Sequence, residues 1–196
     1  MTIMRGLEQI PWLYDTLMRV SDRFGMIRWR RRLVSWSTGR VLEVGCGTGR
    51  NLELYETDSL VGCDPFLGVV VAARRKQHGA HLLVASAEAL PFRADSFDSV
   101  VSSLVFCSVP DPRRGLSEVE RVLDDEGRLL MMEHVRDHRP WRARFQDWIH
   151  PAWKCLSGGC NINRDTESTV RDSGFTIDAE TRRARGTMRL FVARRR

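Results

Sequence analysis

The segment that most constrains the fold is VLEVGCGTGR (41–50), in which a strand-like run leads directly into a turn with three glycines. Gly45, Gly47 and Gly49 follow the spacing G-x-G-x-G, whereas a dinucleotide-binding turn has its third glycine one position later, where this chain has Arg50. Glycines let the backbone approach a ligand closely, and a following helix presents its N-terminal amides to negative charge. The segment therefore predicts the first strand and the ligand-binding turn of an open α/β sheet.

The sequence after residue 40 alternates short β-branched runs with stretches of helical period. This alternation is typical of a parallel sheet that is covered by helices on both faces. We expect strands at 41–44, 60–64, 81–85, 97–103, 127–135, 175–182 and 187–194. We expect helices near 49–56, 66–78, 112–124 and 166–174.

An acidic residue ends the second expected strand. Asp64 lies 19 residues after Gly45, close to the spacing of roughly 20 at which a carboxylate binds the ribose hydroxyls of a nucleotide. The glycine turn and this carboxylate together predict a ligand that contains a nucleoside.

The length of 196 residues, 42% of them hydrophobic, predicts one globular unit at 39–196 after an N-terminal helical cap or lid at 1–38. The cap region has a broken amphipathic pattern with a joint at Gly25 and many arginines. Two interpretations stay open for it: a helix that packs on the core or roofs the site, or a basic helix that contacts an anionic membrane. Its apolar positions are Ile10, Leu13, Leu17, Val20, Phe24, Ile27, Leu33 and Trp36.

The net charge is +6 and the arginines are clustered, which favours anionic partners. No nucleic-acid-binding module accompanies them, so we do not expect a nucleic-acid partner. Five cysteines, an odd number, indicate reduced thiols rather than a disulfide framework. With no secretory signal pattern, we expect a cytoplasmic protein that is free in solution or peripheral to a membrane. The oligomeric state is not predicted.

Four motifs in order resemble those of class I S-adenosylmethionine-dependent methyltransferases: VLEVGCGTG, GCDP, SAEALPF and the long run that begins FDSVVSSLVFCSVP. The resemblance covers about residues 38–136. It implies a Rossmann-like, mostly parallel seven-stranded sheet of order 3-2-1-4-5-7-6 with helices on both faces and an antiparallel last strand. It also implies S-adenosyl-L-methionine as cofactor, with S-adenosyl-L-homocysteine as product.

The resemblance assigns cofactor-binding roles to residues in each motif. Asp64 would bind the ribose, Glu43 would orient the turn or bind the ammonium group, and Ser86 stands where many relatives have aspartate. The full implied set is Glu43, Gly45, Cys46, Gly47, Gly49, Asp64, Pro65, Ser86, Ala87, Glu88, Ser103 and Leu104.

The stretch 133–166 is similar to the thiol S-methyltransferases of animals and their bacterial relatives, which share E-H-V, then P-A-W, then G-C-N. The similarity implies methyl transfer to the sulfur of a small molecule. Similar sequences also include quinone-type C-methyltransferases and phospholipid N-methyltransferases, so both stay alternatives. A module that binds the cofactor without catalysis is a further alternative.

Phe106, Cys107, Trp153 and Asn161 are the expected acceptor-site residues. A thiol acceptor reacts as a thiolate, which needs a positive environment or a base. His134, His150 and Arg164 have suitable side chains and are the candidate catalytic residues. The group of His150 with two nearby cysteines matches no usual zinc pattern, so we expect no metal.

Overall fold

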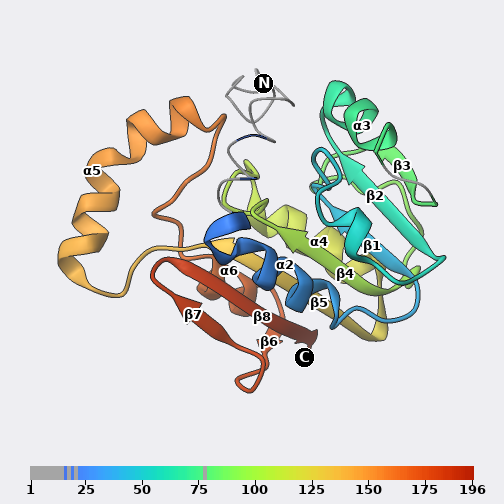
Figure 1. Cartoon of the computed structure of the whole chain (residues 1–196). Helices are drawn as coiled ribbons and strands as arrows, with labels where there is room; N and C mark the ends of the chain where they lie inside the picture. Colours follow the sequence, from blue (N-terminus) through green and yellow to red (C-terminus); the bar gives the residue numbers. More distant parts are fainter. Residues whose placement is uncertain (1–15, 17–18, 20–21, 77–78) are drawn as a thin grey trace.

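The computed structural model describes residues 16, 19, 22–76 and 79–196 (Figure 1). Its centre is one eight-stranded sheet of order β3-β2-β1-β4-β5-β8-β6, with β7 paired to β8. The strands are β1 (Val41–Val44), β2 (Leu60–Asp64), β3 (His81–Val84), β4 (Phe97–Ser103), β5 (Leu123–His134), β6 (Phe175–Ile177), β7 (Arg183–Arg185) and β8 (Met188–Arg195). β8 runs antiparallel to β5. The expected seven-strand order is confirmed with β8 as its antiparallel strand, and the short β7 is an addition.

The helices are α2 (Ile27–Val34), α3 (Leu67–Arg74), α4 (Pro112–Val122), α5 (Pro140–Leu156) and α6 (Thr166–Asp172). α4 begins where the sequence predicts, because the Asp111 side chain accepts a hydrogen bond from the backbone nitrogen of Arg114 at 3.1 Å and Pro112 occupies the first turn. Its apolar stripe then faces the sheet and buries Leu116 and Val119.

Alternating side chains of the central strands build two apolar layers, one on each face of the sheet. Val100 on β4 faces the layer that includes Leu116 of α4, and Val101 faces the layer that includes Leu33 of α2. All four residues are fully buried. This two-sided burial explains why the central strands are apolar almost throughout.

The expected helix at 49–56 is wrong, because only a 3-10 turn, Leu52–Leu54, forms there. Gly49 has φ 82°, which helical residues do not adopt, and Tyr55 is extended. The strand expected at 175–182 is also too long. β6 ends at Ile177, because the side chain of Asp178 accepts a hydrogen bond from the backbone nitrogen of Glu180 at 2.8 Å and forms a turn.

The N-terminal region bends at the expected joint. A π-helical turn, Asp22–Met26, precedes α2, and Gly25 within it has φ 103°. α2 then packs on the sheet through Leu33, and its Val34 is also buried. The rest of the predicted N-terminal helix, including Ile10 and Leu13, lies outside the described residues. Within the described part of the chain, no helix is long and apolar enough to span a bilayer.

Candidate cofactor and acceptor site

The carboxyl ends of β1, β2 and β4 bring the glycine turn, Asp64 and Ser103 to one edge of the sheet. A cavity of about 20 Å³ lies there, lined by the turn together with Glu43, Asn51, Arg30 and Ser103. Its volume has room for about one water molecule, so it marks only the floor of a site. Three neighbouring strands thus build a candidate ligand site at the edge where the sequence predicts it for an open α/β sheet.

Gly45 and Gly47 are required in the turn for different structural reasons. Gly45 has φ 67°, and a Cβ added there would lie 2.4 Å from Cγ2 of Val105, so this glycine allows the loop after β4 to approach. Gly47 has φ 54°, and a Cβ there would meet no atom within 4 Å. The space beside Gly47 is therefore open to a ligand.

Glu43 lies beneath the turn and is buried. Its Oε1 accepts a hydrogen bond from Nδ2 of Asn51 at 2.8 Å, and Nη1 of Arg30 donates to Oδ1 of Asn51 at 2.8 Å. Its Oε2 is buried without a hydrogen-bond partner among the described residues. Burial raises the pKa of Glu43 to about 7, although Tyr55, Asn51 and Arg30 act in the opposite direction.

Asp64 ends β2 with both carboxylate oxygens oriented by the backbone. Oδ2 accepts a hydrogen bond from the nitrogen of Gly47 at 3.1 Å, and Oδ1 accepts one from the nitrogen of Phe66 at 3.0 Å. Burial raises the pKa of Asp64, and these two hydrogen bonds lower it. Pro65 follows directly, so the expected pair Asp64–Pro65 lies at the rim of the site.

The segment Ser86–Glu88 lies beside the end of β2, because the nitrogen of Ala85 donates to the carbonyl of Asp64 at 3.2 Å. Ser86 Oγ accepts a hydrogen bond from the nitrogen of Glu88 at 3.2 Å. Oε1 of Glu88 accepts one from the nitrogen of Asp111 at 2.9 Å, which ties this segment to the start of α4. Ala87 is buried in the core.

A buried carboxylate that sequence reasoning missed shapes the loop after β4. Oε1 of Glu133 on β5 accepts hydrogen bonds from the backbone nitrogens of Val105 and Phe106, both at 2.9 Å. Its Oε2 accepts one from the nitrogen of Cys107 at 3.3 Å. The loop begins at Leu104, whose φ of 60° is unusual for a residue with a side chain. A lone glutamate in the apolar run LLMMEHV was the sequence signal for this role.

Cys107 lies at the end of this loop and packs with Cys160, which follows α5. The hydrogen bond with Cys160 and, second, burial raise the pKa of the Cys107 thiol. The Cys107 thiol, with smaller effects from His134 and Trp153, lowers the pKa of the Cys160 thiol to about 5. His134, Trp153 and the two thiols therefore form one cluster next to the loop after β4.

The other candidate residues hold the same loop. Nδ2 of Asn161 donates to the carbonyl of Cys107 at 2.9 Å, and Oδ1 of Asn161 lies 3.0 Å from Nε2 of His150. Nη1 of Arg164 donates to the carbonyls of Phe106 and Val109, the second at 2.8 Å. His150 and Arg164 thus help to hold the loop after β4 in place, whereas His134 lies beside the thiols of the cluster.

The residues at the sheet edge fit S-adenosylmethionine. The unpartnered Oε2 of Glu43 offers an acceptor for an ammonium group, and the open space at Gly47 leaves room for the chain of a bound amino acid. Asp64 offers a carboxylate that is already oriented. The turn, Glu43 and Asp64 would hold the cofactor.

Comparisons with known proteins identify the family of the chain. Residues 42–131 match the model of a methyltransferase domain family. The thiol S-methyltransferase TMT1B of Homo sapiens is 37% identical over 151 residues, which are 71% of this chain and 62% of that protein. The demethylmenaquinone methyltransferase of Renibacterium salmoninarum is 31% identical over 158 residues, which are 76% of this chain and 66% of that protein.

The chain spans 59% to 62% of the length of the thiol S-methyltransferases of rat and human that it matches. Among solved structures, a S-adenosylmethionine-dependent methyltransferase of Thermotoga maritima superposes with a TM-score of 0.74 at 19% identity, over 97% of this chain and 98% of that one. This likeness extends the shared fold over nearly the whole sequence. By its motifs, its domain match and its fold, the chain belongs to the S-adenosylmethionine-dependent methyltransferases.

Proposed function

We propose that the protein transfers a methyl group from S-adenosylmethionine to the sulfur of a small apolar thiol. The observation that carries the proposal is the group formed by His134, Trp153 and Cys160 beside the loop after β4, in which His134 and Trp153 hydrogen-bond to a sulfur atom. A thiol reacts as its thiolate, so surroundings that favour a sulfur anion suit a thiol acceptor. The identity of 37% to the human thiol S-methyltransferase supports the same acceptor class.

When bound, S-adenosylmethionine supplies a methyl group on a positively charged sulfonium. The protein then contributes alignment and exclusion of water. Glu133 fixes the loop after β4 through its backbone amides, and Arg164 and Asn161 hold the same loop through carbonyls. We assign the proton acceptor to His134, because it lies beside the thiol cluster and is not engaged in holding the loop.

Two other acceptor classes and a non-catalytic role are alternatives to this proposal. Demethylmenaquinone methyltransferase is 31% identical, which keeps carbon methylation of a quinol as an alternative. Nitrogen methylation of a phospholipid headgroup is the second alternative, and binding of the cofactor without transfer is the third. The proposal and its three alternatives predict different results in one methyl-transfer assay.

The test is transfer of a labelled methyl group from S-adenosylmethionine to a panel of acceptors. The panel contains a small alkyl thiol, hydrogen sulfide, a demethylmenaquinol analogue and phosphatidylethanolamine vesicles. Turnover of the alkyl thiol supports the proposal. Turnover of the quinol or the phospholipid alone contradicts it, and silence on every acceptor with intact cofactor binding favours a non-catalytic module.

A variant of the assigned base sharpens the test. His134→Gln should lower kcat/KM for an alkyl thiol by about a hundredfold near pH 7, where the thiol needs a base. The loss should shrink above the pKa of the substrate, where the thiol is already ionised. His138→Gln, which changes an exposed histidine nearby, is the matched control and should keep the wild-type profile. An equal loss at every pH would contradict a base role for His134.

A further inference from the structure

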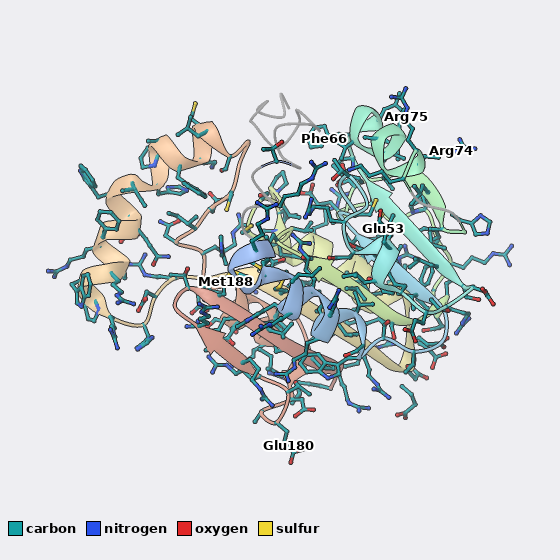
Figure 2. All side chains as sticks on the ribbon, in the orientation of Figure 1. Glu53, Phe66, Arg74, Arg75, Glu180 and Met188 are labelled. Atoms are coloured by element: carbon teal, nitrogen blue, oxygen red, sulfur yellow. The ribbon has the colours of Figure 1, made fainter. Side chains whose placement is uncertain are left out.

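Helix α5 carries large apolar side chains on the side that faces away from the protein. Trp141, Phe145, Trp148 and Leu156 follow helical spacing and share one stripe of the helix. Trp148 is 78% exposed and Trp141 is 65% exposed. Figure 1 shows α5 to one side of the sheet, and Figure 2 shows side chains projecting from the outer side of this helix. We call these four residues the aromatic stripe.

The inner side of α5 is held by polar contacts and by the packing of Ile149 against Cys160 and Ile162. Nε2 of the buried Gln146 donates to the carbonyls of Val135 and Ile162 at 3.2 and 2.7 Å, and its Oε1 accepts from the nitrogen of Asp137 at 2.7 Å. His150 contacts Asn161 on the same side. A surface helix normally buries its apolar face, so the folding of the described part of the chain does not account for the aromatic stripe.

Arginines border the aromatic stripe. Arg144 lies three residues after Trp141 and four before Trp148, so it flanks both rings. The guanidinium of Arg142 lies 5.0 Å from the ring centroid of Trp141. Among the described residues, Arg139 and Arg144 form no ion pair. Asp147, the acidic residue of α5, is occupied by Arg136, with Nη2 and Oδ2 2.7 Å apart. The edge of the stripe is therefore positively charged.

We propose that the aromatic stripe of α5 docks on the surface of an anionic lipid bilayer. Tryptophan favours the boundary between headgroups and acyl chains, because it has an apolar ring and a polar N–H group. The bordering arginines would contact lipid phosphates while their stems follow the apolar surface. A second copy of the chain is a poorer occupant, because each copy carries a net charge of +6 and a basic border on this face. The proposal does not depend on which acceptor is methylated.

The experiment measures flotation of the full chain with vesicles of phosphatidylcholine that contain about one third phosphatidylglycerol, and with vesicles of phosphatidylcholine alone. We expect binding that is stronger on the anionic vesicles and weaker at high salt. The variant Trp141→Ser/Phe145→Ser/Trp148→Ser should bind the anionic vesicles at least tenfold more weakly. Arg139→Gln and Arg144→Gln should each weaken binding about fivefold and reduce the salt dependence.

The matched control is Leu67→Ser/Val71→Ser, which removes two exposed apolar side chains from α3 and should bind like the wild type. Thermal unfolding checks that each variant folds, and little change is expected because the replaced side chains are exposed. The proposal is overturned if the wild type binds neither kind of vesicle. It is equally overturned if the triple variant of α5 binds as well as the wild type, or if the α3 variant loses binding to the same degree.

A second measurement locates the contact. Trp148→Phe preserves the apolar stripe, so the emission spectrum of the wild type minus that of this variant reports on Trp148. Addition of anionic vesicles should shift this difference spectrum to shorter wavelength and protect it from an aqueous quencher. A difference spectrum that vesicles do not change would show that binding occurs elsewhere, and it would overturn the assignment to α5.

Discussion

Oδ2 of Asp64 lies 3.1 Å from the backbone nitrogen of Gly47, so one side chain joins the end of β2 to the glycine turn after β1. Its other oxygen accepts a hydrogen bond from the nitrogen of Phe66. The carboxylate is therefore held in a fixed orientation at the carboxyl edge of the sheet. A ligand that binds there does not have to order it, which lowers the entropic cost of binding.

Replacing Asp64 by alanine should weaken binding of S-adenosylhomocysteine by several-fold to a hundredfold. This range corresponds to about 1 to 3 kcal/mol for a lost charge-assisted hydrogen bond. Isothermal titration calorimetry measures the change, and Asp58→Ala, at an exposed carboxylate before β2, is the control. If Asp64→Ala binds S-adenosylhomocysteine with unchanged affinity, the assignment of Asp64 to ribose binding is wrong.

Glu43 should make the stability of the ligand-free protein depend on pH. Its pKa is raised from an ordinary value of 4.5 to about 7, so the folded state binds the proton more tightly than the unfolded chain does. The contribution to stability is fully present below pH 4.5 and is lost as the pH rises through 7, a decrease on the order of 3 kcal/mol.

Denaturant unfolding at several pH values between 4.5 and 8 measures this dependence. Glu43→Gln should remain neutral throughout, so its free energy of unfolding should lack this decrease. If the wild type and the variant change in parallel with pH, the Glu43 carboxyl is not the titrating group.

The close approach of Gly45 and Val105 predicts that substitutions at these two positions have coupled effects on stability. Gly45→Ala would place a Cβ 2.4 Å from Cγ2 of Val105 and should destabilise the protein by at least about 2 kcal/mol. Adding Val105→Ala should recover part of the loss, because it removes the clashing methyl groups. Gly47→Ala meets open space and should cost only about 1 kcal/mol for its left-handed backbone.

Urea unfolding of the four variants, Gly45→Ala, Val105→Ala, their double and Gly47→Ala, gives the comparison. A coupling energy near zero between Gly45→Ala and Val105→Ala would contradict the steric explanation.

Glu133 should matter for stability as much as a large core residue does. Glu133→Ala would leave the buried backbone nitrogens of Val105, Phe106 and Cys107 without their acceptor, at a cost of at least about 3 kcal/mol. Glu126→Ala changes an exposed carboxylate on the same strand and should change stability little. Similar free energies of unfolding for the two variants would contradict the role of Glu133.

The sequence predicts β1, β2 and β4 at their observed bounds, because each apolar run is closed by a turn or a glycine. It does not predict the short turn at Leu52–Leu54, because the backbone of Gly49 and the hydrogen bond between Asn51 and Glu43 override the local preference for helix. Propensity describes only the local chain, and these constraints come from its neighbours.

For the site, the motifs bring Gly45, Gly47 and Asp64 to one edge, as expected. Sequence reasoning could not assign Glu133, because the role of a carboxylate inside an apolar strand is visible only when its partners in the loop after β4 are seen. The helical spacing of the tryptophans in α5 also does not predict that Trp148 is exposed. Helical spacing shows which residues share a face of a helix, but it does not show which face turns inward.

The way in which Glu133 binds the loop after β4 has a consequence for hydrogen exchange. The carboxylate accepts hydrogen bonds from the backbone nitrogens of residues 105–107, so the loop is tied to β5 at three consecutive amides. These amides should therefore exchange with solvent deuterium much more slowly than those of an ordinary surface loop.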